Sequence, residues 1–582
     1  MFKTTCPLDC FDGCSIEVDE NLKLKGEKSH PITQGYLCHH LTNYHKFPRI
    51  QKASYNAKQI SKEEAFEILK EKLKSSNPQK TLYFKGSGNL GSMQSITRKF
   101  FALYGSDVAK GSLCEDAGAA GIEEGRGANL ALSPLHVKDA EVVILWGRNP
   151  SITNSHMLPV LKGKKIIVID PVKIDFAHKA DIFIQIRPRG DIYLAMLLAR
   201  IAYMEEMEDK EFIEQRCENF DYFCDFINAI PIQKLVEKSG VDLVKAGEIL
   251  SLIRGKKVSF LVGLGVQKYA HGHSVLRAID SLAAMLGLFG KEGCGVGYIA
   301  DSGFGFSSPF RAKVKSVLLP TVDFGKYDVV FIQGGNPANQ MPCTPKVKEG
   351  LKKAGFVVYF GLHENETSKL ADLIIPAKSF LEKEDLKLSY GHEYIGYMPK
   401  IVENNEAFSE YELTQKLLDA FSFETLKEEK EYIQEIVNSN STQRDGRLIS
   451  KTFMQLPYEK EFYTSSGKFE FFDDFYDDFE SEKAFFLLST KWNKSLNSQF
   501  ITDEFLHIPP ALGLEDGSLV TLDNGEYSCK FVVKNDERLR DDCLLLHSGH
   551  KDANVLTPHL VSQEGDCAIF QEIKVDLKVC DG

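Results

Sequence analysis

The chain has 582 residues, of which 43% are hydrophobic and 26% are charged, and its formal net charge is −12. A chain of this length exceeds what one hydrophobic core supports, so several domains are predicted. The acidic balance argues against nucleic-acid binding, which requires a basic surface. The apolar runs are too short to cross a bilayer and the first residues lack a signal-peptide core, so we expect a cytoplasmic protein without membrane insertion.

Four cysteines close to the N-terminus form the first motif. Cys6, Cys10 and Cys14 are separated by three residues each within a segment rich in Pro, Asp and Gly, and 23 further residues precede Cys38. Four thiolates held on loops with such spacing can bind a cubane iron–sulfur cluster. A structural zinc ion is the alternative, although zinc ribbons usually use cysteines two residues apart. The spacing therefore favours an iron–sulfur cluster.

A fifth cysteine, Cys114, lies in the segment GSLCEDAGAAG between small and acidic residues rather than on an apolar stripe. Such a segment is typical of a loop that leads into a helix, where backbone N–H groups stabilise a thiolate. From these residues alone, a buried structural thiol remains the simpler interpretation.

The middle of the chain contains one layout twice. Each copy begins with an apolar strand that runs into a turn with the sequence Gly-x-Asn-Pro, and two further strands follow with helical patterns between them. This order predicts two β-α-β-α-β units with parallel sheets. The strands are expected at 141–146, 164–170 and 180–188 in the first copy, and at 327–333, 355–361 and 371–377 in the second.

Ligands of such sheets lie at the carboxyl ends of the strands, where glycine lets the backbone approach a phosphate. Asp170 ends a strand about 20 residues after the first glycine turn, which is the usual place for an acid that binds a nucleotide. Another buried strand, within 260–267, ends at Gly263 and Gly265. Two matching turns predict two similar ligands, or one ligand and a relic of duplication.

The C-terminal part has a different pattern. Residues 400–480 are polar, acidic and aromatic, with a helical stretch at 428–437, and short strands follow from Phe485. The segment 519–533 reads as a β-hairpin. We therefore expect a small β-barrel of about 110 residues at the end of the chain.

In this order, these landmarks resemble the molybdopterin oxidoreductase superfamily, which includes dimethyl sulfoxide reductase, formate dehydrogenase and periplasmic nitrate reductase. CPLDCFDGC followed by GYLC is similar to the [4Fe–4S] motif of a subgroup with the pattern CPHDCPDTC. WGRNP, IDP and IQIRPRGDIYLA resemble the segments that bind a pterin nucleotide in the family, and GLGVQKY, GGNPANQ and HSGHKDANVLT also have counterparts in the same order. The resemblance covers nearly the whole chain.

The resemblance implies an α/β multidomain fold with a small N-terminal [4Fe–4S] domain, two related doubly wound α/β domains and a C-terminal β-barrel. We expect residues 1–55 to form the iron–sulfur domain and residues 475–582 to form the barrel that covers the cofactor. Residues 56–106 together with 302–430 are expected to bind one pterin nucleotide, and residues 107–301 the other. Residues 431–474 are expected to connect them.

The resemblance also implies the cofactors and the residues that bind them. Cys6, Cys10, Cys14 and Cys38 would hold the [4Fe–4S] cluster, and Cys114 would be the catalytic ligand of molybdenum or tungsten. Asp191 would read the guanine of one nucleotide. The small residues around Cys114, at Gly111, Ser112, Gly118 and Gly121, would leave room for a bulky cofactor. The residues expected to bind bis(molybdopterin guanine dinucleotide) are Gly147, Arg148, Asn149, Pro150, His156, Asp170, Asp191, Gly263, Gly265, Gly334, Gly335, Asn336, Pro337 and Asn554.

The implied activity is two-electron oxygen- or sulfur-atom chemistry on a small molecule, with an electron-transfer protein as partner. A non-redox hydratase with the same cofactors and a metal-free electron-transfer or scaffold subunit are the alternatives. Two departures matter. Relatives often have a lysine after the fourth cluster cysteine, where this chain has His39 and His40, and formate dehydrogenases have a histidine after the metal ligand, where this chain has Glu115. The second departure argues against formate as the substrate.

Overall fold

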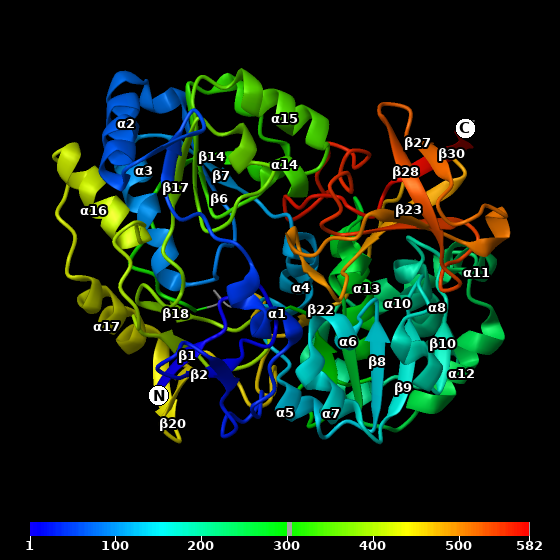
Figure 1. Ribbon diagram of the computed structural model, residues 1–582. Coiled ribbons are helices and arrows are strands. Elements are labelled where there is room, and N and C mark those ends of the chain that lie inside the picture. The colour runs from blue at the N-terminus through cyan, green and yellow to red at the C-terminus, as the bar shows by residue number, and fades with distance from the viewer. Residues whose placement is uncertain (300–304, 581–582) are drawn as a thin grey trace.

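The computed structural model describes residues 1–299 and 305–580 (Figure 1). Two large sheets, a small N-terminal antiparallel sheet and a C-terminal closed barrel form the framework. In Figure 1 the eight-stranded sheet lies at the upper left, the five-stranded sheet at the lower right and the barrel at the upper right. The predicted α/β multidomain fold is therefore confirmed. The domain boundaries stay predictions, and the one at 301–302 lies outside the described residues.

The five-stranded sheet is parallel throughout and contains the first predicted repeat. Its order is β10-β9-β8-β12-β13. Every residue of the two central strands β8 and β12 is buried, as expected where helices cover both faces of a parallel sheet. Helices α8 (Asp191–Met204) and α13 (Gly272–Met285) belong to the core of this unit. The strands are β8 (Val142–Trp146), β9 (Lys165–Ile169), β10 (Ile182–Ile184), β12 (Val258–Val262) and β13 (Gly295–Gly297).

The eight-stranded sheet contains the second predicted repeat and joins two distant parts of the sequence. Its order is β14-β7-β6-β15-β16-β17-β4-β5, and the neighbours from β14 to β17 are parallel. The hairpin β4–β5 adds an antiparallel edge. The strands are β4 (Ala53–Tyr55), β5 (Lys58–Ile60), β6 (Thr81–Lys85), β7 (Asp107–Lys110), β14 (Lys315–Leu318), β15 (Val329–Gln333), β16 (Val357–Gly361) and β17 (Leu373–Pro376).

Helices from two parts of the sequence pack against this second sheet, α2 from its N-terminal part and α16 and α17 from the acidic region. The capping box at Ser61 starts α2 (Lys62–Ser75), because the Ser61 side chain and the Glu64 side chain each bind the other residue's backbone N–H. In the acidic region, α16 (Glu410–Ala420) and α17 (Glu429–Asn440) bury leucines and isoleucines in the same core as the sheet. The helical stretch predicted at 428–437 is therefore confirmed.

The C-terminal strands close into the predicted barrel, in the order β23-β29-β26-β28-β27-β30. The hairpin predicted at 519–533 is present, with antiparallel pairs from Leu519 with Val532 to Asp523 with Ser528. The interior is filled with leucine, isoleucine, valine and phenylalanine. The strands are β23 (Phe485–Thr490), β26 (Phe505–Ile508), β27 (Leu519–Asp523), β28 (Ser528–Asn535), β29 (Cys543–His547) and β30 (Lys574–Val579).

The N-terminal cysteine motif lies on a small antiparallel sheet at the lower left of Figure 1. Strand β1 (Phe2–Thr5) pairs with β2 (Ser15–Val18), and β3 (Leu24–Gly26) extends the sheet. Because Thr5 pairs with Ser15, residues 6–14 form one loop at the end of this hairpin. Cys38 immediately precedes the short helix α1 (His39–Thr42).

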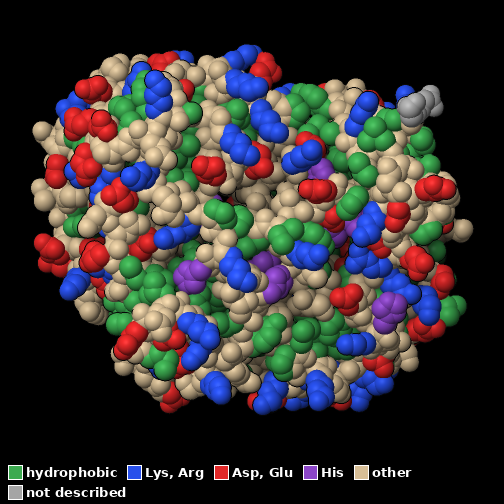
Figure 2. Space-filling view, in the orientation of Figure 1, with side chains coloured by type: hydrophobic (Ala, Val, Ile, Leu, Met, Phe, Trp, Pro, Cys, Tyr) green, Lys and Arg blue, Asp and Glu red, His purple; other side chains and the backbone are tan. Residues whose placement is uncertain are grey.

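On the face drawn in Figure 2, side chains of lysine and arginine and of aspartate and glutamate both occur around the rim of the molecule. Among the helices in the described part of the chain, none has the length and apolar composition of a membrane span.

Candidate cofactor cavity

One cavity of about 1360 Å³ lies where the cysteine loop, both sheets and the barrel meet. Pockets for ordinary small molecules have volumes of about 300–1,000 Å³, so this cavity has room for a larger ligand. Its lining brings together residues that are far apart in the sequence. Among them are the predicted site residues Cys6, Cys10, Cys14, Cys38, Cys114, Gly147, Arg148, Asn149, His156, Asp170, Asp191, Gly263, Gly265, Gly334, Gly335, Asn336, Pro337 and Asn554.

The loop that carries the first three cysteines is held from inside the protein. The Cys6 N–H donates to the Cys14 carbonyl at 2.8 Å, which closes the loop. Lys387, on β18 (Asp385–Lys387), is only 2% exposed, and its Nζ donates to the carbonyls of Cys6 at 2.9 Å and Leu8 at 2.6 Å. The role of this lysine could not be predicted from the sequence, because its partners lie about 380 residues away.

Burial controls the charge of these thiols. It raises the pKa of Cys6 to about 11, and it also raises the pKa of Cys10, Cys14 and Cys38. A thiolate at these positions therefore needs a nearby positive charge, as a metal would provide. The sulfur atoms of these four cysteines lie farther apart than the ligands of a single metal ion would. Among the described residues, only Asp503, His507 and His547 bring three ligand atoms all within 4.8 Å of one another.

The loop around Cys114 is fixed by a set of polar contacts. Its N–H donates to Ser112 Oγ at 2.8 Å, and its carbonyl accepts from Gln267 Nε2 at 2.8 Å. Lys268 Nζ donates to the Leu113 carbonyl at 2.7 Å. Helix α4 (Asp116–Arg126) begins two residues after Cys114, so the predicted loop leading into a helix is present. Gln267 and Lys268 were missed by the sequence analysis, although they lie in the quoted segment GLGVQKY.

The Cys114 thiol is partly exposed to the cavity but surrounded by protein. Burial raises its pKa well above the ordinary value, the charges of Glu115 and Asp9 raise it further, and Lys268 lowers it. Asp9 accepts a hydrogen bond from Tyr390 Oη at 3.0 Å. Asp9 and Tyr390 both line the cavity, so the cysteine loop contributes polar groups close to Cys114 as well as its cysteines.

The small residues after Cys114 have a different role from the one that the sequence suggested. Gly118 and Gly121 were expected to leave room for a bulky cofactor. A Cβ on Gly121 would instead lie 2.1 Å from the His273 carbonyl, and one on Gly118 would lie 2.8 Å from the ring of Tyr298. These glycines therefore let α4 pack closely against α13 and its surroundings, and that expectation was wrong for both.

The two glycine turns have equivalent geometry. Gly147 follows β8 and Gly334 follows β15, and both have φ of +58°, a value that favours glycine. Each turn leads into a short helix with proline at its start, α6 (Pro150–Thr153) and α14 (Pro337–Gln340). The two Gly-x-Asn-Pro segments therefore form turns of the same conformation.

The polar residues of the two turns differ in their partners. In the second turn, the Asn336 amide is fully used inside the protein, donating to Glu366 and Ser498 and accepting from Thr367. In the first turn, Arg148 Nε and Asn149 Oδ1 are buried, and no described group satisfies them. Buried polar atoms normally have partners, so this part of the cavity fits a polar ligand such as a phosphate-bearing cofactor.

Asp170 and Asp191 lie together at the carboxyl edge of the five-stranded sheet. Asp170 follows β9 and accepts from the Val172 N–H at 2.8 Å, and Asp191 begins α8 and accepts from Trp146 Nε1 at 2.7 Å. The pKa of each carboxyl is raised to about 7, mainly by burial and, for Asp170, also by the charge of Asp191. Both acids border the cavity, at the place where nucleotides bind in parallel sheets.

His156 connects the first turn to the cysteine loop. Its Nδ1 lies 2.7 Å from the carboxylate of Asp12, its Nε2 lies 3.2 Å from the Tyr36 carbonyl, and the same Nε2 is 3.9 Å from Cys14 Sγ. Burial lowers the pKa of His156, but the hydrogen bond and charge of Asp12 outweigh it, so the net shift is upward. The predicted cofactor residue thus contacts the cysteine loop directly.

The barrel reaches the second turn through Asn554. Its Nδ2 donates to the Asn339 carbonyl at 2.8 Å, and its Oδ1 accepts from Thr557 at 3.1 Å. His39 and His40, which stand where relatives have a lysine, both line the cavity. The His40 ring packs against Phe500 with 4.9 Å between ring centroids, and its Nε2 has no hydrogen-bond partner among the described groups.

Comparison with known proteins agrees with this architecture. The profile of the family described as molybdopterin oxidoreductase matches residues 46–406. The chain is 27% identical to the probable oxidoreductase YyaE of Bacillus subtilis, over 81% of this chain and 78% of that protein. It is 25% identical to the probable oxidoreductase YoaE of the same organism, over 99% of this chain and 98% of that protein.

The same fold is found in a solved structure. Acetylene hydratase from Pelobacter acetylenicus superposes with a TM-score of 0.79 over the whole of both chains, at 18% sequence identity, which establishes the fold alone. The family match covers more than half of the present sequence. The chain therefore belongs to the molybdopterin oxidoreductases, enzymes that work with a molybdenum or tungsten pterin cofactor.

Proposed function

We propose that this enzyme performs two-electron oxygen- or sulfur-atom chemistry on a small molecule at a molybdenum or tungsten centre, and that one [4Fe–4S] cluster passes the electrons to a partner protein. The observation that carries the proposal is the single cavity bordered by the four N-terminal cysteines, Cys114 and both glycine turns. The chain supplies binding and orientation, and the cofactors supply the redox chemistry.

The four N-terminal cysteines are assigned to the [4Fe–4S] cluster. In a tetrahedral zinc site, sulfur atoms about 2.3 Å from the metal lie about 3.8 Å from one another. No three of these sulfurs meet even the looser separation of 4.8 Å within the described chain. The wider arrangement supports a cubane, whose four irons hold their cysteines farther apart. Lys387 adds a buried positive charge close to Cys6 and Cys10, which stabilises the anionic ligands.

The nucleotide ends of two pterins are assigned to the two glycine turns. At the first turn, the unsatisfied Arg148 Nε would donate to a phosphate oxygen, and the unsatisfied Asn149 Oδ1 would accept from an N–H or O–H group of the cofactor. Asp170 and Asp191 would accept the N–H donors of guanine. At the second turn, Gly334 and Gly335 expose backbone to the cavity, while Asn336 holds the turn through its internal bonds.

Cys114 is assigned as the protein ligand of the metal. The Gln267 and Ser112 contacts hold its backbone in the wall of the cavity that its side chain lines. Lys268 lowers the pKa of the thiol and favours the thiolate that a metal requires. The metal, when bound, would supply a centre that exchanges two electrons with the substrate. Asp9 and Tyr390 line the same cavity and would accept or donate a proton to a molecule bound there.

Elemental and nucleotide analysis tests the assignment as a whole. Protein purified without oxygen should contain about four irons and four sulfides per chain, as a single cubane requires. One molybdenum or tungsten per chain and two guanosine nucleotides after acid hydrolysis are also expected. Stoichiometric zinc without iron would contradict the cluster. Iron without molybdenum or tungsten would indicate an electron-transfer or scaffold subunit, and a metal that keeps one oxidation state through turnover would indicate a hydratase.

Replacement of Cys114 tests the metal ligand. Cys114→Ala should keep its iron, because the four cluster cysteines are untouched, but its metal should change its electron paramagnetic resonance spectrum and turnover should fall by orders of magnitude. Cys529→Ala is the matched control, since Cys529 lies on barrel strand β28. If Cys114→Ala kept both the wild-type spectrum and the wild-type turnover, the ligand would have to be another residue.

A further inference from the structure

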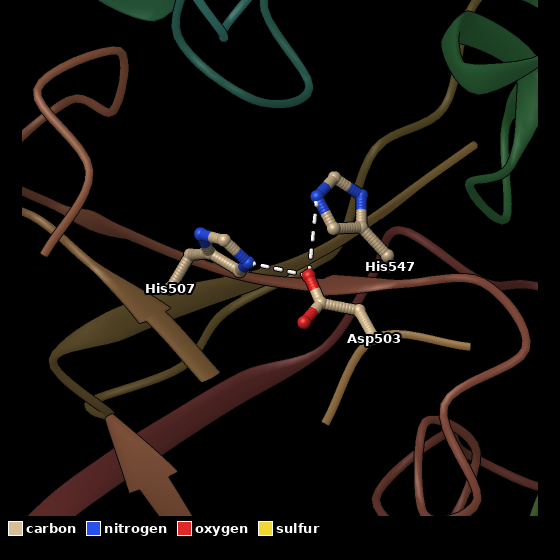
Figure 3. A group of neighbouring side chains, drawn as sticks. All are labelled: Asp503, His507 and His547. Carbon is tan, nitrogen blue, oxygen red and sulfur yellow. Dashed lines mark hydrogen bonds and ion pairs between the residues drawn. The ribbon is translucent and has the colours of Figure 1, made fainter. Parts of the chain in front are cut away.

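A second group of potential metal ligands lies in the C-terminal barrel, apart from the cysteines. Asp503 precedes β26, His507 lies on β26, and His547 ends β29 (Figure 3). All three side chains are buried, with exposed fractions of 8%, 7% and 5%. His547 also borders the large cavity, so the group lies in the wall between the barrel and the cavity.

The three side chains converge on one point. His507 Nε2 lies 2.7 Å and His547 Nε2 lies 3.7 Å from the same oxygen, Oδ2 of Asp503. Figure 3 shows both rings directed toward that carboxylate from different sides. The three ligand atoms all lie within 4.8 Å of one another, so small rotations of the side chains would let one metal ion bind all three.

In each histidine ring, Nδ1, the nitrogen that points away from Asp503, already has a polar partner. His507 Nδ1 lies 3.3 Å from Asp536, which Arg538 in turn pairs, and His547 Nδ1 lies 3.2 Å from Thr490 Oγ1. Metal-binding histidines typically have this arrangement, in which a carboxylate or hydroxyl fixes one nitrogen and directs the other toward the ion. The inner nitrogens are therefore oriented as ligands.

His547 is not satisfied by the protein alone. Its Nδ1 lies 3.2 Å from Thr490 Oγ1, but its Nε2 lies 3.7 Å from Asp503 Oδ2, which is too far for a hydrogen bond. A cation between His547 and Asp503 would bind both atoms and close this gap.

We propose that Asp503, His507 and His547 bind one divalent cation of the zinc type. Two imidazole nitrogens and one carboxylate oxygen suit Zn²⁺, and three protein ligands leave one position for water or another oxygen donor. The ion would displace the proton that His507 otherwise shares with Asp503. Such a site would tie β26 to β29 beside the cavity and would be independent of the cluster cysteines and Cys114.

The competing structure contains no metal. In it, a protonated His507 is held between Asp503 and Asp536, whose hydrogen bonds raise the pKa of the imidazole against the effect of burial. That network satisfies both nitrogens of His507, whereas His547 has only its contact with Thr490 and its stacking on Trp492. The two structures therefore differ most in what they predict for variants of His547.

Zinc analysis of the full chain distinguishes the zinc site from the metal-free network. Protein purified without oxygen, so that the cluster cysteines keep their iron, is dialysed against dipicolinate and then equilibrated with ZnCl₂ near pH 7.5. Wild type should bind one zinc more per chain than His547→Asn or Asp503→Asn. His559→Asn is the matched control, because His559 lies in the same C-terminal region but outside the group, and it should bind zinc like wild type. Iron content measured in parallel shows that the cluster is intact in each sample.

X-ray absorption at the zinc edge gives a second measurement that needs no variant. Zinc in the proposed site should have only nitrogen and oxygen neighbours at about 2.0–2.1 Å. Sulfur neighbours at about 2.3 Å would place the zinc on cysteines and would overturn the proposal. Equal zinc content in wild type and in His547→Asn would overturn it too, and would leave the protonated His507 network as the correct description.

Discussion

At the scale of single residues, burial decides which groups in the cavity wall carry charge. Asp170 and Asp191 have pKa values raised to about 7, from 3.8 for an ordinary aspartate. In the cofactor-free chain the folded state therefore holds protons that the unfolded chain has already lost between about pH 4 and pH 7. The contribution of this pair to the free energy of unfolding falls as the pH rises through that range.

The same pair predicts a pH-dependent affinity for guanine nucleotides. The N–H donors of guanine bind an ionised carboxylate better than a protonated one, so affinity should rise as the pH increases from about 6 to about 8. Calorimetric titration of cofactor-free protein with GDP measures this. Asp191→Asn keeps the shape but removes the charge, and it should bind more weakly with a flatter pH profile. A wild-type affinity that does not change with pH would exclude this role for the pair.

Lys268 predicts an effect on the metal rather than on folding. Its ammonium group lies beside the Cys114 loop and favours negative charge there. Removing this charge should make the centre harder to reduce, so Lys268→Met should lower its midpoint potential, while Lys268→Arg should stay close to wild type. Redox titration followed by electron paramagnetic resonance measures both. An unchanged potential in Lys268→Met would mean that the lysine only holds the Leu113 carbonyl.

At the scale of helices and strands, α4 connects the Cys114 loop to the core of the first sheet. Arg126 near its end forms a fully buried pair with Asp280 of α13, with two contacts of 2.6 Å, and Arg126 also donates to the Val296 carbonyl. A buried pair of this kind fixes the position of two helices, and the loss of one partner leaves an uncompensated charge.

Asp280→Ala should therefore destabilise the protein by about 3–5 kcal/mol, the range found when one partner of a buried ion pair is removed. Thermal unfolding followed by circular dichroism measures the loss as a lower midpoint. The double variant Arg126→Met with Asp280→Leu removes both charges and should recover much of the midpoint. If the single variant were as stable as wild type, water would have to reach the Arg126 guanidinium.

Local patterns in the sequence predicted the strands and turns, because both depend on neighbouring residues. The buried strands β8 and β15 and the glycine turns after them follow from apolar runs and from two Gly-x-Asn-Pro segments. Contacts between distant segments could not be predicted in this way, because no local pattern in the sequence marks them. Lys387 below the cysteine loop and Asp12 against His156 depend on partners more than 140 residues away. The roles expected for Gly118 and Gly121 were wrong for the same reason, since Tyr298 and His273, far along the sequence, pack against them.

At the scale of the whole molecule, the barrel region contacts the carboxyl edges of both large sheets. Arg540 Nη1 donates to the Gln185 carbonyl near the first sheet at 2.9 Å, and Asn554 Nδ2 donates to the Asn339 carbonyl near the second at 2.8 Å. The segment 473–484 leads into the barrel without helix or strand, and most of its residues are exposed. A cofactor buried between these parts would contact all of them, so its binding should couple the barrel to the rest of the chain.

This coupling predicts that the cofactor protects the segment before the barrel from proteolysis. A ligand that binds only the assembled form lowers the population of opened forms, and proteases cut the opened forms. A glutamate-specific protease should therefore cut at Glu480 and Glu482, both exposed, more slowly in the cofactor-loaded protein than in the cofactor-free protein. The exposed Glu424, between α16 and α17, is the internal control and should be cut at the same rate in both forms. Equal cleavage at 480–482 in both forms, measured by mass spectrometry over time, would mean that the barrel is held in place by its protein contacts alone.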